Sequence, residues 1–333
     1  MFTENNENTS KFQLTYITEE DLDRKYNILK ELEKETEAKH NRIYDYLTYP
    51  GTSLDEKKRV TLLDWMMDLC TDIGFKRDTY HQAVVIQEIY MSQVKKIDLS
   101  KYQLLGITSL LISAKLEETK LPPLDMFSKA TAEAYNTTEI KKFEKVILTK
   151  LSWKVIYPNM CKWGNIIMNE WDIFIKNNIK DRYYCTFKND SLSENYLFKN
   201  LFIIIDVISL DYYHIFFNEK YIVISLCYLL LGIAMKCFGL NDIFNCKFNE
   251  SNNVNFCFFK EVFGYFIQSI FNVKLSSLDQ YLTYVGQFFN ICFEYKDSSF
   301  IGLTQEDTLQ FQTKNPSNLD SIKNILEIRN CKI

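Results

Sequence analysis

The chain has 333 residues, a formal net charge of −4 and an isoelectric point of about 5.6, so it lacks the basic character of a general nucleic-acid binder. Nine cysteines, an odd number without a C-x-x-C pair, indicate reduced intracellular thiols, and only three histidines argue against a structural zinc site. Hydrophobic residues make up 47% of the chain and only 9 glycines and 5 prolines interrupt it, so we expect long helices around a sizeable core.

The N-terminal region combines a polar segment with a charged helix. Residues 1–17 are rich in Asn and Glu, which predicts disorder, and no secretory signal is visible there. A helix is predicted over 19–39, because acidic residues suit its first turn and apolar residues recur at helical spacing, at Leu22, Tyr26, Leu29 and Leu32. This thin stripe has two interpretations, which the sequence leaves open: it packs on its own domain, or it faces a partner.

Five helices are predicted between residues 53 and 151. An S-x-x-E capping box at Ser53 opens the first, which ends at Gly74, and a second covers 79–94. A second capping box at Ser100 opens a helix over 101–117 that is apolar on nearly every side, which is typical of a central helix surrounded by others. Two prolines forbid its continuation, and two shorter helices follow, over 123–132 and 138–151.

The same order of events recurs after Pro158. The third of five predicted helices is again apolar nearly all round, and a capping box at Ser191 precedes the second; the helices cover 159–176, a stretch ending at Ile208, 219–236, 256–270 and 277–294. The apolar segment 221–235 has 15 residues, whereas a membrane-spanning helix needs about 20, so we interpret it as a core helix. The polar tail after residue 297 is expected to be mobile.

Landmark residues in the first set of helices carry a family resemblance. Arg59 stands five residues before Asp64-Trp65, residues 102–106 read YQLLG, and Lys115 stands in A-K-L-E-E. Glu144 lies nine residues before Trp153, and Glu88 occupies a position on the second helix where the family normally has Asp. This pattern resembles the cyclin box, strongly over 57–157 and more weakly over 159–294, and its residue sequence is most similar to E-type cyclins.

The resemblance implies an all-α fold of two tandem five-helix cyclin boxes with an N-terminal helix. It divides the chain into a disordered N-terminus (1–17), an N-terminal helix and linker (18–50), a first, kinase-binding box (51–157), a second box (158–296) and a mobile tail (297–333).

A kinase-binding surface is also implied. In the family, a Lys and a Glu hydrogen-bond backbone groups of the kinase, and the matching residues are Lys115 and Glu144. Apolar contacts around them would come from Leu116, Val146, Leu148 and Trp153. The alternative interpretation is an internal salt bridge of little energetic value surrounded by ordinary core residues.

Two further sets of residues receive roles from the resemblance. Arg59 and Glu88 are expected to form a buried structural pair that orients the first two helices of the box. A docking groove for Arg-x-Leu motifs of substrates or inhibitors would include Leu62, Trp65, Asp68 and Gln103. However, Lys58 replaces the usual Met and Thr61 the usual Ile, so we expect a weakened groove; ordinary core packing of Leu62 and Trp65 is the alternative.

The functional expectation is a regulatory subunit and not an enzyme. The sequence contains no Walker loop, G-x-S-x-G, kinase H-R-D or D-F-G, or H-E-x-x-H motif, and we expect no cofactor, metal, nucleic acid or membrane partner. The chain would bind and activate a cyclin-dependent kinase in cell-cycle control, at G1/S, in the nucleus and cytoplasm. The alternatives are a transcription-associated cyclin and a transcription-factor-IIB-like scaffold, which shares the fold.

Overall fold

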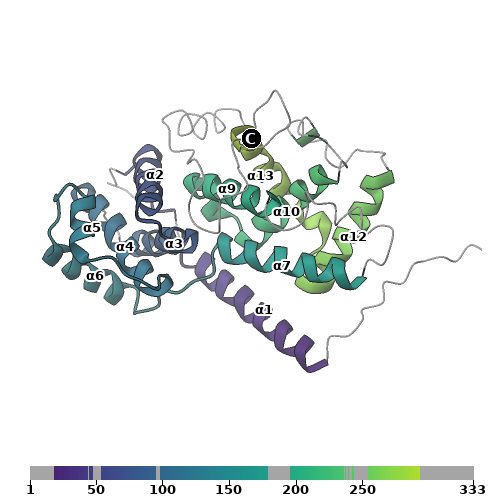
Figure 1. The fold of residues 1–333 in the computed structure, drawn as a ribbon, viewed down its shortest axis with the longest axis horizontal. Coiled ribbons are helices and arrows are strands. Elements are labelled where there is room, and N and C mark those ends of the chain that lie inside the picture. The colour runs from purple at the N-terminus through teal and green to yellow at the C-terminus, as the bar shows by residue number, and fades with distance from the viewer. Residues whose placement is uncertain are drawn as a thin grey trace, which may run out of the picture.

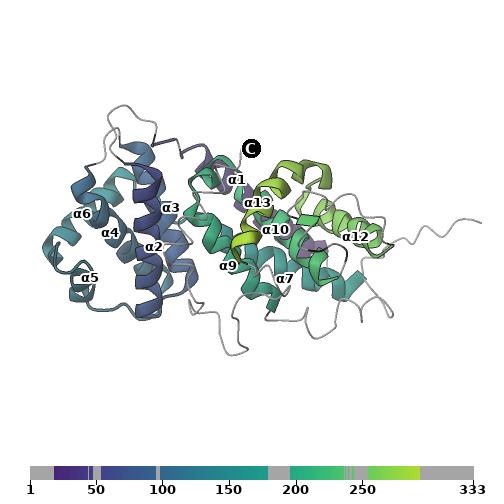
Figure 2. The same cartoon turned by 90° about the horizontal axis from the view of Figure 1, so that it is seen from above.

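The computed structural model describes residues 19–43, 45–47, 54–94, 98–178, 196–235, 237, 239, 242–243 and 254–292. Within these ranges the chain is built from helices and contains no β-strand, which confirms the all-α prediction. Figure 1 shows two groups of helices side by side, α2 to α6 on the left and α7 to α13 on the right, and the view from above in Figure 2 shows the same division. The predicted segments 1–17 and 297–333 lie outside the described residues.

The first helical unit contains five helices: α2 (Glu56–Ile73), α3 (Arg77–Gln93), α4 (Tyr102–Glu117), α5 (Leu124–Ala130) and α6 (Thr137–Lys150). Helix α4 is the central one, as its apolar surface predicts, and it contacts α2, α3 and α6. Nearly all its side chains are buried as far as Ala114, and the helix then becomes exposed at Lys115. The last turn of α4 therefore leaves the core and places the charged side chain of Lys115 at the surface.

The second helical unit also contains five described α-helices: α7 (Met160–Asn178), α9 (Tyr196–Leu210), α10 (Glu219–Ala234), α12 (Val254–Phe271) and α13 (Asp279–Cys292). Three short 3₁₀ turns complete the described elements: η1 (Leu99–Lys101), η2 (Tyr212–Phe216) and η3 (Leu275–Leu278). Helix α10 is central, and α7, α9, α12 and α13 all contact it. No helix among the described residues is long and apolar enough to span a membrane. Most side chains of α10 are buried, as expected for a core helix over 221–235.

The helix starts differ from the predicted capping boxes. Helix α2 is capped by Asp55, whose Oδ1 accepts from the backbone N–H of Lys58 at 2.8 Å, and Ser53 lies outside the described residues, as does Ser191. Ser100 is not a cap either, because Asp98 caps the preceding turn η1 and accepts from the Ser100 backbone N–H at 3.1 Å. In both places a nearby Asp supplies the acceptor that the serine was expected to supply. The predicted end of α2 is confirmed, since Gly74 adopts the left-handed conformation with φ 77°.

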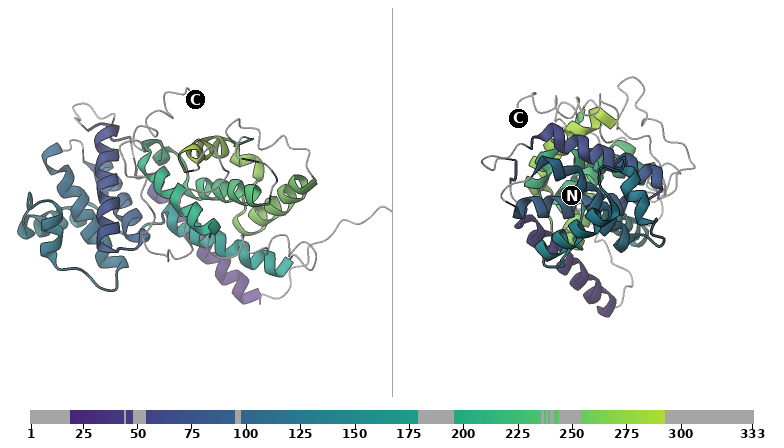
Figure 3. Two further views of the ribbon diagram at one scale, coloured as in Figure 1. Left: turned by 45° about the horizontal axis from the view of Figure 1, so that its top comes forward. Right: turned by 90° about the vertical axis from the view of Figure 1, so that its left-hand side faces the viewer.

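Helix α1 (Glu19–His40) lies along the second unit, as the left view of Figure 3 shows. Ion pairs fasten it there. Lys39 forms a buried pair with Glu219 and donates to the Pro158 carbonyl at 2.6 Å, and the buried Lys220 pairs with the partly exposed Glu33. The apolar stripe contributes less than its pattern suggests, because Leu29 and Leu32 are only partly buried and Tyr26 is exposed; the side chain of Leu22 is outside the described residues. Of the two interpretations, packing on its own chain is the one that the contacts support.

Candidate functional site

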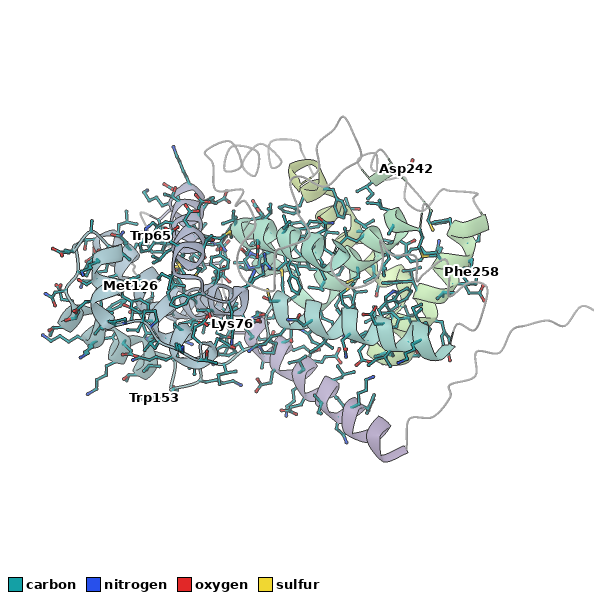
Figure 4. The ribbon with its side chains drawn as sticks, in the orientation of Figure 1. Trp65, Lys76, Met126, Trp153, Asp242 and Phe258 are labelled. Atoms are coloured by element: carbon teal, nitrogen blue, oxygen red, sulfur yellow. The ribbon has the colours of Figure 1, made fainter. Side chains whose placement is uncertain are left out.

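Exposed apolar side chains gather where α4 and α6 end. Leu116, Trp153 and Ile156 are all large hydrophobic residues with at least two fifths of their surface in water. Trp153, at 69% exposure, is the most exposed large hydrophobic side chain of the described part of the chain, and Figure 4 places it at the lower edge of the first unit. An apolar cluster of this kind on a soluble protein marks an interaction surface more often than chance exposure.

An ion pair lies at the centre of this cluster. Lys115 Nζ, from the last turn of α4, is 2.5 Å from Glu144 Oε1 on α6, with the Lys side chain exposed and the Glu side chain mostly buried. The pair lines a hollow of about 580 Å³ together with apolar side chains, chiefly Leu116, Leu148, Trp153 and Ile156. We call this hollow and its rim the α4–α6 surface.

Five of the six residues predicted for this surface therefore lie together. Val146 does not line the hollow, because it follows Glu144 by two positions and a helix turns about 100° per residue, whereas Leu148 follows by four and shares its face. Ile156 was missed by the sequence reasoning. Its signal was present in the segment after α6, where Trp153 and Ile156 alternate with the buried residues Val155 and Tyr157.

The chemistry of the α4–α6 surface suits recognition. An ammonium group has three donors and a carboxylate has several acceptor positions, so this pair can satisfy itself and still bind polar groups of a partner. No group of three or more His, Cys, Asp or Glu side chains that could hold a metal ion occurs among the described residues.

Arg59 and Glu88 form a fully buried ion pair between α2 and α3, with Nη2 and Oε1 2.5 Å apart. The guanidinium also donates to the carbonyl oxygens of Leu210 at 2.7 Å and Ser209 at 3.1 Å, at the C-terminal end of α9 in the second unit. Burial alone would raise the pKa of the Glu88 carboxyl, but His214 and Arg59 beside it lower that pKa to about 2. The pair thus joins the two units as well as two helices of the first unit, a link that the sequence did not predict.

A second buried cluster joins the same two units. Asp206 on α9 accepts from Arg77 Nε at 3.0 Å, and its other carboxylate oxygen is 2.9 Å from His81 Nε2. Both Arg77 and His81 belong to α3. Because buried polar groups are costly unless they are paired, these contacts fix the relative placement of the units.

The predicted docking groove is a second hollow, of about 650 Å³, between α2 and the start of α4. Leu62, Trp65 and Gln103 line it, whereas Asp68 is not among the lining residues. Gly106 lets the two helices approach, since a Cβ there would come within 3.0 Å of Leu62 Cδ1. In Figure 4, Trp65 lies toward the top of the first unit and Trp153 at its lower edge, so the groove and the α4–α6 surface are separate.

Both replaced groove residues line the hollow. Lys58 Nζ is 2.6 Å from Asp55 Oδ2, so its charge is paired across one helical turn. Thr61 also lines it, with its hydroxyl donating to the Lys57 carbonyl at 2.8 Å. The rim of the groove therefore carries a closed ion pair and a hydroxyl where the family pattern has two apolar side chains.

Asp64, beside Trp65, is expected to destabilise the protein at neutral pH. Its carboxyl is half-buried, Oδ1 lacks a hydrogen-bond partner, and burial together with Asp68 raises the pKa from 3.8 to about 6. The folded state therefore binds the Asp64 proton more tightly than the unfolded state does. The stability that the protonated carboxyl contributes is fully present below pH 3.8 and is lost as the pH rises through 6. Asp64→Asn should raise the free energy of unfolding by about 1 kcal/mol at pH 7.5, after allowance for solvent screening of a half-exposed group.

Urea unfolding of the wild type and of Asp64→Asn at pH 7.5 and pH 4 tests this expectation. The gain should shrink toward zero at pH 4, where the folded wild type already carries the proton. An equal gain at both pH values would show that the amide stabilises the protein for a reason other than charge.

Comparison with known proteins finds a family match for the first helical unit. The family described as "Cyclin, N-terminal domain" matches residues 25–156, which include most of α1 and all of the first unit. The chain is 32% identical over 133 residues to the G2/mitotic-specific cyclin-B2 of Rana japonica, covering 40% of this chain and 32% of that protein. It is 35% identical over 115 residues to the G1/S-specific cyclin-E1 of Gallus gallus, covering 34% and 28%.

The matched region spans less than a third of the length of either relative. Among solved structures, the chain is similar to a viral cyclin from herpesvirus saimiri, with 13% identity, a TM-score of 0.49, and coverage of 77% of this chain and 96% of that one. Residues 25–156, the part of the chain that matches the N-terminal domain of cyclins, contain the whole five-helix unit in which the landmark residues are in place.

Proposed function

We propose that this chain is a regulatory subunit that binds a cyclin-dependent kinase through the α4–α6 surface and activates it. The observation that supports the proposal is an ion pair, Lys115 with Glu144, framed by exposed apolar side chains on the unit that matches the cyclin N-terminal domain. Paired opposite charges suit the ends of a partner's helix, where backbone N–H and C=O groups lack partners. The chain itself supplies no catalytic group in this proposal.

The apolar rim would provide most of the affinity. Burying a large apolar side chain stabilises a complex by about 2 kcal/mol, whereas an exposed ion pair contributes about 0–1 kcal/mol. Leu116, Trp153 and Ile156 together therefore outweigh the pair in energy, and the role of Lys115 and Glu144 is to fix orientation. Activation then requires that the surface bind the active conformation of the kinase more tightly than the inactive one.

The stage of the cell cycle belongs to the same proposal. The residue sequence of the first unit favours a G1/S role, and the relatives include both G1/S and mitotic cyclins. We propose that the protein acts in the nucleus and cytoplasm. A panel of purified cyclin-dependent kinases, from cell-cycle and transcriptional classes, tests the proposal: activation of a cell-cycle kinase supports it, activation of a transcriptional kinase alone favours the transcription-associated alternative, and activation of none contradicts it.

The groove on α2 is proposed as a weakened docking site for Arg-x-Leu motifs. Replacing Lys58→Met and Thr61→Ile should tighten the binding of such a peptide about tenfold, because about 1 kcal/mol of apolar contact is regained and a positive charge is removed. Removal of Lys58 also releases the Asp55 carboxylate, which can then attract the Arg of the peptide. The improvement should be larger at low salt than at high salt.

Peptide titration by fluorescence anisotropy measures this effect, with Lys260→Met on the distant helix α12 as a control for loss of a positive charge. Equal affinity before and after the two groove substitutions would mean that the hollow takes another ligand or none.

A further inference from the structure

Helix α6 ends in an unusual backbone conformation. Ser152 and Trp153 both have positive φ, 54° and 62°, which non-glycine residues rarely adopt and which bulky residues adopt least of all. The Ser152 N–H donates to the Thr149 carbonyl at 3.1 Å, and the Trp153 N–H donates to the Leu148 carbonyl at 2.8 Å. These two bonds form the Schellman motif, in which glycine normally occupies the place that Ser152 holds here.

The segment around this turn is anchored on both sides. Leu151 before it is fully buried, and the Val155 carbonyl after it accepts from Gln82 Nε2 at 2.6 Å. Between them, the Lys154 carbonyl accepts from the Tyr157 hydroxyl at 2.8 Å. A strained conformation persists only when its surroundings over-determine it, and these contacts supply that constraint.

The indole gains little from the arrangement within its own chain. Trp153 is 69% exposed although it lines the hollow beside Lys115 and Glu144, so burial of the ring does not compensate for its backbone strain. A helix could end at this point with Gly and a polar residue and avoid both costs. Strain together with an exposed aromatic ring at the rim of a binding hollow points to a use outside this chain.

We propose that Ser152 is a positioning residue, whose left-handed turn holds the Trp153 indole in its binding orientation before the partner arrives. This inference rests on the proposed function, since the partner is the kinase that occupies the α4–α6 surface. Binding is tighter when a side chain is already ordered, because the complex then loses less conformational freedom when it forms. The turn thus contributes to affinity without touching the partner itself.

Three variants separate the turn from the ring. Ser152→Val disfavours the left-handed conformation but still carries the Trp153 side chain, whose orientation is then no longer held. We therefore expect kinase affinity to fall about fivefold. Ser152→Gly adopts that conformation readily, so affinity should stay within about twofold of wild type while the melting temperature is equal or higher. Trp153→Asn keeps the turn and removes the ring, so affinity should fall at least tenfold with little change in stability.

Fluorine NMR of the free chain labelled with 5-fluorotryptophan provides a readout that a purely structural role would not move. The chain has 4 tryptophans, and Trp153→Asn identifies the resonance of residue 153 by its loss. We expect that resonance to broaden or to sharpen with faster motion in Ser152→Val and to remain unchanged in Ser152→Gly. The kinase used is the one from the purified panel that the wild-type chain activates, and affinity is measured by surface plasmon resonance.

The outcomes distinguish this inference from the proposed function. If Ser152→Val binds the kinase as tightly as wild type, or its indole resonance is unchanged, Ser152 does not position the ring. If Trp153→Asn also binds normally while charge exchange at Lys115 and Glu144 abolishes binding, the surface is used without the indole and the inference is wrong. If the wild-type chain binds no kinase, the proposed function fails and the inference fails with it.

Discussion

Exchange of the two charges at the α4–α6 surface, in a Lys115→Glu and Glu144→Lys double variant, is expected to abolish kinase activation and leave the fold intact. The exchange keeps an ion pair between α4 and α6, so any purely internal role of the pair is preserved. The pair is partly exposed, and its loss would alter stability by at most about 1 kcal/mol. Toward the kinase, however, each exchanged charge now faces a backbone group of unfavourable polarity: the carboxylate meets C=O groups and the ammonium meets N–H groups. This mismatch costs several kcal/mol and lowers affinity about a hundredfold or more.

Kinase assays with matched thermal melts measure this prediction. The control variant exchanges Lys260 and Glu261 on α12, which are both exposed and lie in the second unit, far from the α4–α6 surface in Figure 1. It should activate the kinase like the wild type. Normal activation by the Lys115 and Glu144 exchange would mean that the pair is only an internal salt bridge, the alternative that the sequence left open.

Arg59→Ala should lower the free energy of unfolding by about 3–5 kcal/mol, because it leaves a buried carboxylate without its guanidinium partner. Glu88 is 2% exposed, and its pKa near 2 shows that it stays ionised over the whole neutral range. The same change removes the donors to the carbonyl oxygens of Ser209 and Leu210. Arg59→Met combined with Glu88→Leu should recover only part of the loss, since those two carbonyls still lack donors.

Urea unfolding followed by circular dichroism measures the single and double variants. Lys57→Ala, an exposed position on the same helix, is the matched control and should change stability by less than about 0.5 kcal/mol. A double variant that recovers fully would show that the contacts to α9 contribute nothing. An Arg59→Ala protein as stable as the wild type would contradict the account of this buried pair altogether.

Hydrophobic periodicity predicted the helices well where their environment is uniform. Helices α4 and α10 are surrounded on all sides, so their sequences are apolar on all sides, and their bounds fall within about two residues of those expected. Capping was predicted less well, because several residues near Asp55 and Asp98 could accept the same backbone hydrogens and the sequence does not rank them. The sequence predicted that an apolar stripe would attach α1, whereas ion pairs hold it. Long-range pairs such as Lys39 with Glu219 leave no periodic signal in the sequence.

The candidate site likewise contains some features that the sequence predicted and others that it did not. Lys115 and Glu144 were assigned from a family pattern, and the spacing of Leu148 on α6 was sufficient to place it beside them. No sequence rule could show that Arg59 reaches the end of α9, because the carbonyl groups it binds belong to the backbone and are common to every residue. The positive φ of Trp153 was equally hidden, since Ser and Trp are not residues from which a left-handed turn is predicted.

Hydrogen–deuterium exchange of the full chain, with and without the kinase that it activates, shows directly whether the kinase covers the α4–α6 surface. We expect slower exchange at the end of α4, along α6 and through residues 151–156, with little change in the groove on α2. Protection confined to the groove or to the second unit, in a complex that is nevertheless active, would contradict the assignment of the α4–α6 surface as the kinase-binding site.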